Sequence, residues 1–259
     1  IARPGAMGRI SGFGWGLGYL GGLFTLMIAL GMIQLSQSKG LTAADAVPWV
    51  MVSTAAVIVL AVLPALSWLR ERAHPSAKVP AGVFATMFVH FKQDRHRFSQ
   101  FHRLLVCVAC YQSGVSVVIT LAAVYAKEAM GFTMDQTIML VLAVNVAAAI
   151  GAMLFGWVQD RVGHRLALSL TLTGWIFMVA LAYVARSPGV FWAAAGIAGL
   201  CMGTSQSAGR AMAGSLAPMD RLSSFYAQWT FALQLAAAIG PLSYGLVTWL
   251  TGGDHRSGM

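Results

Sequence analysis

The residues best placed for specific chemistry lie in the stretch GWVQDRVGHR, which separates two long apolar runs. Its glycines and charged residues are Gly156, Asp160, Arg161, Gly163 and Arg165. A carboxylate between arginines at the edge of an apolar segment can pair locally, and it can also accept hydrogen bonds from the N-terminus of a neighbouring helix. Gly163 suits a tight turn. The pattern predicts an electrostatic contact between helices at a short polar loop.

A second group consists of polar side chains inside the apolar runs. Such residues often line a solute path in membrane proteins, although Ser and Thr can also bond to their own helix and small residues often just pack. Helical spacing places Gln112 and Ser116 on one stripe, and Asn145 heads another that runs to Gly156. The candidates for a solute cavity are Gln112, Ser116, Asn145, Gln206 and Gln234.

The chain lacks the residue clusters that an enzyme or a metal site needs. All eight Asp and Glu residues, and the six His, lie in connectors or at the edges of apolar runs. Membrane enzymes require His, carboxylates or an activated Ser gathered at one depth, and zinc requires several ligands together. The G-x-G-x-x-G spelled by residues 16–21 follows no strand, which argues against a dinucleotide site. We therefore expect no enzymatic activity, no cofactor and no metal.

Seven apolar runs of about 20 to 25 residues must position these groups, because such a run covers a bilayer as a helix. Hydrophobic residues make up 58% of the 259 residues and charged residues 10%, with a mean hydropathy of +0.72. The expected fold class is all-α, a polytopic helical membrane protein with lipid as its surroundings. The predicted spans are 11–35, 47–69, 104–125, 136–158, 166–185, 190–209 and 226–250.

The first span is rich in glycine, which lets helix backbones approach closely in a membrane. Gly14, Gly18 and Gly22 have the four-residue spacing of a packing face. This face either packs statically or slides against another helix bundle, and the sequence is compatible with both.

Charge predicts the orientation and the division of the chain. With the N-terminus in the cytoplasm, 13 of the 17 Lys and Arg residues fall on the cytoplasmic side, as the positive-inside rule favours. Their scatter over connectors argues against nucleic-acid binding despite the net charge of +9. The long basic connector 70–103 would separate residues 1–69 from residues 104–259. Phenylalanines at helical spacing make it either an amphipathic helix on the membrane surface or a solvated linker.

The polar loop resembles the major facilitator superfamily signature G-x-x-x-D-R-x-G-x-R, with Gly156, Asp160, Arg161, Gly163 and Arg165 at its positions. The stretches ISGFGWGLGYLGG, GLCMGTSQSAGRAMAGSLAP and FYAQWTFALQLAAAIGPLSYG look like helices five, ten and eleven of the vacuole-effluxer-like branch, whose fungal members export amino acids from the vacuole. This resemblance implies a partial major-facilitator fold, seven of twelve transmembrane helices. The chain opens at Ile1, so we expect a piece of a longer protein.

The resemblance and the charge pattern together predict a secondary transporter that moves a small solute by alternating access. We expect a monomer in the cell membrane. We also hypothesise that Asp160, with Arg161, reaches the start of the first span near Gly8 to Gly12 in one end state, as a latch. A non-transporting membrane scaffold, a receptor-like bundle and a membrane enzyme are the alternatives. The last span contains no Lys for a retinal Schiff base, which argues against a photoreceptor.

Overall fold

The computed structural model describes residues 5–68, 91, 96–128 and 130–251. Within them it has seven α-helices, one short 3₁₀ helix and no strand, which confirms the all-α prediction. The helices are α1 (Met7–Ser38), α2 (Ala43–Trp68), α4 (Ser99–Glu128), α5 (Met134–Val162), α6 (His164–Val184), α7 (Pro188–Leu216) and α8 (Leu222–Leu250), with η1 (Met219–Arg221) before α8.

Each predicted span corresponds to one of these helices, and the ends differ by seven residues or fewer. Most helices extend beyond the predicted apolar runs, because the polar residues that flank each run continue the backbone hydrogen bonds of the α-helix. The predicted surface helix in the 70–103 connector falls largely outside the described residues. The end of that connector, from Ser99 onward, already belongs to α4.

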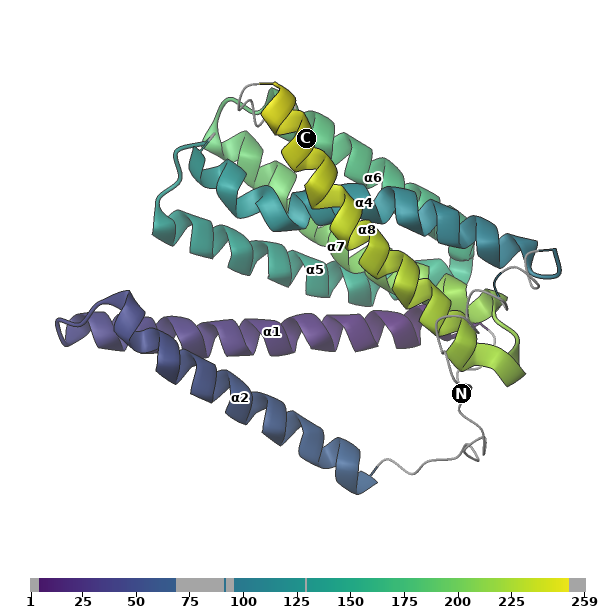
Figure 1. The fold of residues 1–259 in the computed structure, drawn as a ribbon, viewed down its shortest axis with the longest axis horizontal. Helices are drawn as coiled ribbons and strands as arrows, with labels where there is room; N and C mark the ends of the chain where they lie inside the picture. Colours follow the sequence, from purple (N-terminus) through teal and green to yellow (C-terminus); the bar gives the residue numbers. More distant parts are fainter. Residues whose placement is uncertain (1–4, 69–90, 92–95, 129, 252–259) are drawn as a thin grey trace. The chain divides into compact units, whose positions relative to one another are not determined.

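Six of the described helices are long and apolar enough to cross a membrane, and the chain is a multi-pass membrane protein in contact with lipid. The helix missing from the six is α7, which at 29 residues is long enough but carries many glycines and polar residues. It contacts α4, α5, α6 and α8 (Figure 1), and about half of its residues are buried. Neighbouring helices, in place of lipid, surround much of α7, so it can be less apolar than the rest.

The chain divides into two compact units, residues 1–19 with 84–259 and residues 20–83. In the second unit, the rest of α1 turns into α2 at Gly40, whose φ is +75°. Large apolar side chains of α2 are exposed, among them Trp49 at 66% and Leu66 at 76%. Such a surface suits contact with lipid tails, which offer no hydrogen-bond partners to polar side chains. The first unit holds the candidate sites.

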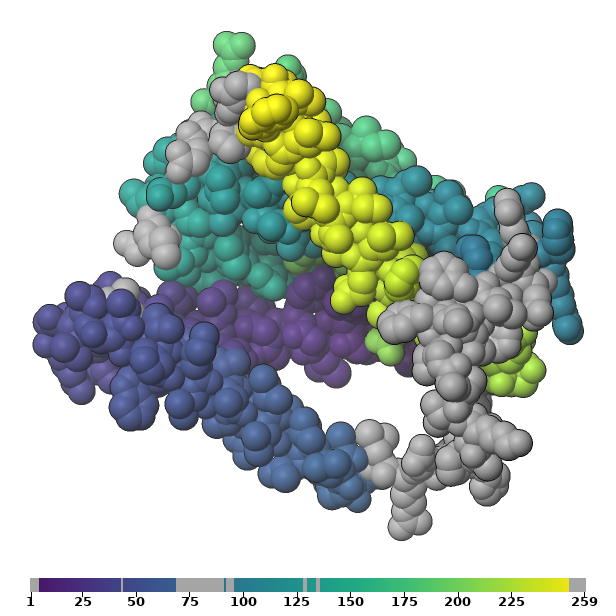
Figure 2. All heavy atoms as spheres, viewed as in Figure 1, coloured from purple at the N-terminus to yellow at the C-terminus, as the bar shows by residue number. Residues whose placement is uncertain are grey.

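Glycines let the central helices of the first unit approach to backbone contact. A Cβ added at Gly199 of α7 would lie 2.5 Å from the Val144 carbonyl oxygen of α5, and one at Gly203 would overlap the Ala148 carbonyl oxygen. In the same way, a Cβ at Gly240 of α8 would overlap the Ser113 carbonyl oxygen of α4. Side chains of α8 lie directly against α4 in the space-filling view (Figure 2). These contacts fix the helices at distances that larger residues would not allow.

Aromatic clusters occupy both ends of this bundle. At one end the rings of Phe101 and Phe225, each 1% exposed, have centroids 4.5 Å apart and join α4 to α8. At the other end Phe191 of α7 stacks on Tyr125 of α4, with centroids 5.7 Å apart. Aromatic pairs of this kind contribute beyond their burial of area.

Thr133 caps α5 with a full capping box, in which its hydroxyl accepts from the Gln136 N–H and the Gln136 side chain accepts from the Thr133 N–H. Thr133→Ala is expected to lower the free energy of unfolding by about 1 kcal/mol, because it leaves a first-turn N–H without its acceptor. The check is an unfolding titration in mixed micelles of a mild detergent and sodium dodecyl sulfate. Thr137→Ala is the control, since that hydroxyl bonds only to the carbonyl of Thr133 in its own turn.

Candidate functional site

The polar loop is a one-residue turn between α5 and α6. Gly163 separates Val162, the last residue of α5, from His164, the first of α6, and its φ is +90°. This conformation is strained for residues with a Cβ. The signature residues thus lie in the last two turns of α5, at the turn itself and in the first turn of α6.

Asp160 contacts the first turn of α1 with both carboxylate oxygens. Oδ1 accepts a hydrogen bond of 2.7 Å from the Gly8 N–H, and Oδ2 accepts one of 3.1 Å from the Arg9 N–H. The Arg9 guanidinium donates a third, from Nε to Oδ2 at 3.0 Å. The first N–H groups of a helix lack partners within it and carry partial positive charge, so a carboxylate is a favourable acceptor there.

Burial is uneven across this contact. The Asp160 side chain is 7% exposed, whereas that of Arg9 is 41% exposed. Removing a carboxylate from water is unfavourable unless donors replace its hydration, and three donors do so here. Arg9 also lies 5.0 Å from the ring centroid of Trp157, a cation–π contact that holds its guanidinium against α5.

Glycines on both helices make this approach possible. A Cβ on Gly8 would lie 2.7 Å from the Gly156 carbonyl oxygen, and a Cβ on Gly156 would lie 2.7 Å from the Gly8 carbonyl oxygen. One turn later, a Cβ on Gly12 would overlap the Ala152 carbonyl oxygen. Deeper along α1, the Ser11 hydroxyl donates a 2.9 Å hydrogen bond to the carbonyl of Ser207 in α7, so α1 contacts two helices of the bundle.

The predicted packing glycines lie on a different side of α1. A Cβ at Gly14, Gly18 or Gly22 would meet no atom within 4 Å in the part of the chain that the structure describes. Their role in helix packing therefore stays a prediction. The glycines that do contact α5 share the same four-residue spacing, starting from Gly8, and the sequence pattern alone did not distinguish the two sides.

Within the described part of the chain, two other signature residues make no comparable contact. Arg161 and Arg165 are exposed to the surroundings. The cation that pairs with Asp160 is Arg9, which the hypothesis did not name. Its position beside Gly8 was the available signal, because an arginine in the first turn of α1 lies next to the N–H groups that the hypothesis assigned to Asp160.

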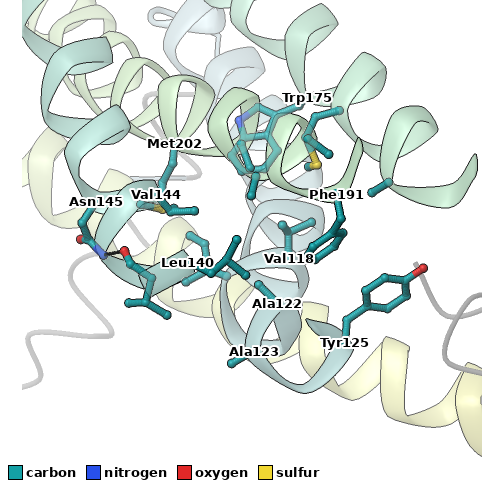
Figure 3. A pocket seen from close by; sticks show the side chains of 17 residues that line it. Val118, Ala122, Ala123, Tyr125, Leu140, Val144, Asn145, Trp175, Phe191 and Met202 are labelled. Carbon is teal, nitrogen blue, oxygen red and sulfur yellow. Dashed lines mark hydrogen bonds between the residues drawn. The ribbon is translucent and has the colours of Figure 1, made fainter. Parts of the chain in front are cut away.

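Of the five cavity candidates, Asn145 lines a cavity of about 170 Å³ among α4, α5, α6 and α7. Figure 3 shows Val118, Leu140 and Trp175 among the side chains around it, with Asn145 at one edge. The Asn145 amide donates to the Val141 carbonyl of its own helix at 2.8 Å. A lining this apolar suits an apolar group better than a charged one.

The other four candidates do not line this cavity. Gln112 and Ser116 are each 7% exposed and lie buried in the bundle, Gln206 is half-buried, and Gln234 is exposed. The structure thus does not bring the five together at one place. Gln228, which the sequence analysis did not select, is 4% exposed, and its amide has no hydrogen-bond partner among the described residues.

Metal ligands do not gather in the described residues, where no three His, Cys, Asp or Glu side chains come together. Cys107 and Cys110 are exposed on α4 and Cys201 is buried in α7, all as free thiols. The arrangement around Asp160 offers hydrogen bonds and charge that connect the start of α1 to α5.

Comparisons of the sequence with known proteins found a matching family and a relative. The sequence model of a family described as vacuole effluxer Atg22 like matches residues 5–259. An uncharacterised MFS-type transporter of Bacillus subtilis (strain 168), YxiO, is 23% identical over 253 residues, which is 95% of this chain. The chain spans 58% of the length of that curated relative. No solved structure matches the chain.

Proposed function

Because the chain belongs to the vacuole effluxer Atg22-like family, we propose that it forms part of a secondary transporter that moves a small solute by alternating access. The observation that supports this proposal is the contact of Asp160 with the first turn of α1. In a transporter of two helix bundles, α1 would belong to the first bundle and α4 to α8 to the second. The contact would then hold the bundles together on one side of the membrane.

The latch would close the cytoplasmic side, where the positive-inside rule predicts the N-terminus and the α5–α6 turn. It combines a carboxylate, two backbone donors and a guanidinium, so it is strong when aligned and lost when α1 moves away by a few ångströms. Alternation needs contacts that form in one end state and break in the other. Export of amino acids or related metabolites across a cell membrane is the first activity to test, because the family is described as similar to a vacuole effluxer.

The test is solute flux by the full-length protein in vesicles, with labelled amino acids as the first panel. Asp160→Ala is expected to reduce flux about tenfold or more, because it removes the acceptor for all three donors. Asp220→Ala is the matched control, since Asp220 is an exposed carboxylate in η1, and it should keep the flux of the unmodified protein. Equal flux in both variants would contradict the latch hypothesis. Absence of flux for every solute class would favour a non-transporting scaffold.

A further inference from the structure

A second set of contacts lies one residue before Asp160 and connects three helices. Gln159 in the last turn of α5 is 1% exposed. Its Nε2 donates a 3.2 Å hydrogen bond to the Ala208 carbonyl oxygen of α7, and it lies 2.8 Å from Nδ1 of His164 at the start of α6. The signature treats this position as variable, and no role has been assigned so far to Gln159 or His164.

The acceptor at Ala208 determines how the hydrogens are arranged. A backbone carbonyl oxygen only accepts, so the side-chain atom facing it must be the NH₂ of Gln159 and not its carbonyl oxygen. The same NH₂ then supplies its second hydrogen to Nδ1 of His164. Nδ1 must therefore carry a lone pair, which requires a neutral imidazole with its proton on Nε2.

A proton on Nδ1 is incompatible with this arrangement. Two N–H groups would then face each other, and the Gln159 amide would have to rotate to present its oxygen to the imidazolium. Rotation would set that oxygen against the Ala208 carbonyl oxygen, where two acceptors repel. Because Gln159 is buried, water does not replace the lost hydrogen bond.

The charged groups around His164 come from each neighbouring helix. Asp160 of α5 acts electrostatically on the imidazole, and the Arg9 guanidinium of α1 is already bound to Asp160. Arg165 of α6 follows His164 directly, and Arg210 of α7 lies two residues after Ala208. Both arginines are exposed, and histidine is the residue type at this turn whose ordinary titration range lies between about pH 5 and 8.

We propose that Gln159 and neutral His164 hold the last turn of α5 against α7, and that a proton taken up by Nδ1 of His164 releases the Asp160 latch. Gln159 is a positioning residue, since it acts on α1 through Asp160, its neighbour in the chain. Loss of the Ala208 hydrogen bond frees the last turn of α5 from α7, and both Asp160 oxygens then lose their alignment with the Gly8 and Arg9 N–H groups. This inference rests on the latch of the proposed function.

The test uses the full chain in nanodiscs, with Cys107→Ser, Cys110→Ser and Cys201→Ala to remove native thiols. Ser11→Cys then places one thiol in the contact of α1 with α7, where Ser11 is 6% exposed. Its alkylation by a membrane-impermeant maleimide reports separation of α1 from the bundle. Rates are taken between about pH 8 and about pH 4.5, which covers the ordinary titration range of histidine and extends below it.

His164→Asn is the reference variant. Asparagine can present an oxygen where Nδ1 stands, and that oxygen accepts from Gln159 at every pH without taking up a proton. Dividing each rate by that of His164→Asn at the same pH removes the intrinsic pH dependence of the thiol. The ratio for unmodified His164 is expected to be near one at the higher pH and to rise about fivefold or more at the lower pH.

Two further variants separate the possible failures. Gln159→Leu and Asp160→Ala should both alkylate rapidly at both pH values. If Asp160→Ala is rapid but the ratio for unmodified His164 stays flat, the inference is wrong and the latch stands. If Asp160→Ala is as slow as the unmodified chain, the latch and the inference both fail. Should Gln159→Leu not fold, as size-exclusion elution would show, the His164→Asn ratio still decides.

Discussion

Gly203→Ala is expected to lower the free energy of unfolding by about 3 kcal/mol or more, an effect large for the addition of one methyl group. The new Cβ would overlap the Ala148 carbonyl oxygen, and it would also lie 2.9 Å from the Ala152 backbone nitrogen. Backbone atoms cannot move aside as a flexible side chain can, so α5 and α7 must separate along their whole contact. The check is the same unfolding titration in mixed micelles.

Gly196→Ala is the matched control, because it makes the same change on the same helix. A Cβ at Gly196 would meet nothing within 4 Å in the described structure. Alanine there should leave the bundle unchanged or stabilise it by about 0.5–1 kcal/mol, since alanine loses less backbone freedom than glycine on folding. Equal stability of the two variants would contradict the close approach of α5 and α7.

The second large effect is expected for Gly12→Leu, which should detach the start of α1 from α5. Its side chain would overlap the Ala152 carbonyl oxygen, so the contact would shift toward the separated state by about tenfold to a hundredfold. Spin labels at the exposed positions of Phe13 and Leu154 would report this by pulsed electron paramagnetic resonance. We expect the short distance between the labels to become longer and more broadly distributed.

Gly18→Leu is the control in the same 259-residue chain, because a Cβ at Gly18 meets no described atom within 4 Å. It should leave the distance between the labels unchanged. If Gly12→Leu also leaves it unchanged, the backbone approach of α1 to α5 does not exist in the membrane. Unfolding of the bundle itself should be unaffected by either variant, since α4 to α8 pack without α1.

The fold followed from the sequence because lipid imposes a simple rule, about 20 apolar residues to a helix. All seven helices were recognisable from the sequence, including α7, whose polar residues are covered by its neighbours. The helix ends were less predictable, because the sequence does not distinguish polar residues that extend a helix from polar residues in the connector that follows it. The 29 residues of α7, for example, exceed the predicted span by nine.

The site was only partly predictable, and the reason is the spacing of glycines. Asp160 stood out as a carboxylate at the edge of an apolar run, but the faces of α1 starting at Gly8 and at Gly14 have the same period. Which of them meets α5 depends on the rotation of α1 about its axis, which hydropathy does not encode. Gln159 was hidden for another reason, since a glutamine in a loop signature has no pattern that distinguishes a buried amide from a solvated one.

In the Asp160 contact, substitution is better tolerated at Arg9 than at Asp160. Two of its three donors are main-chain amides, which every residue except proline possesses. A substitution at position 9 therefore leaves both amides in place, whereas a side chain at Gly8 would meet Asp160 and the Gly156 carbonyl oxygen. Replacing Arg9 removes one of the three donors, its charge and its cation–π contact with Trp157. Substitutions should thus be tolerated in evolution far more readily at position 9 than at position 160. No other side chain of the loop can replace the two carboxylate oxygens of Asp160 as acceptors. Added salt should have little influence as well, because ions reach the exposed guanidinium but not the sheltered carboxylate.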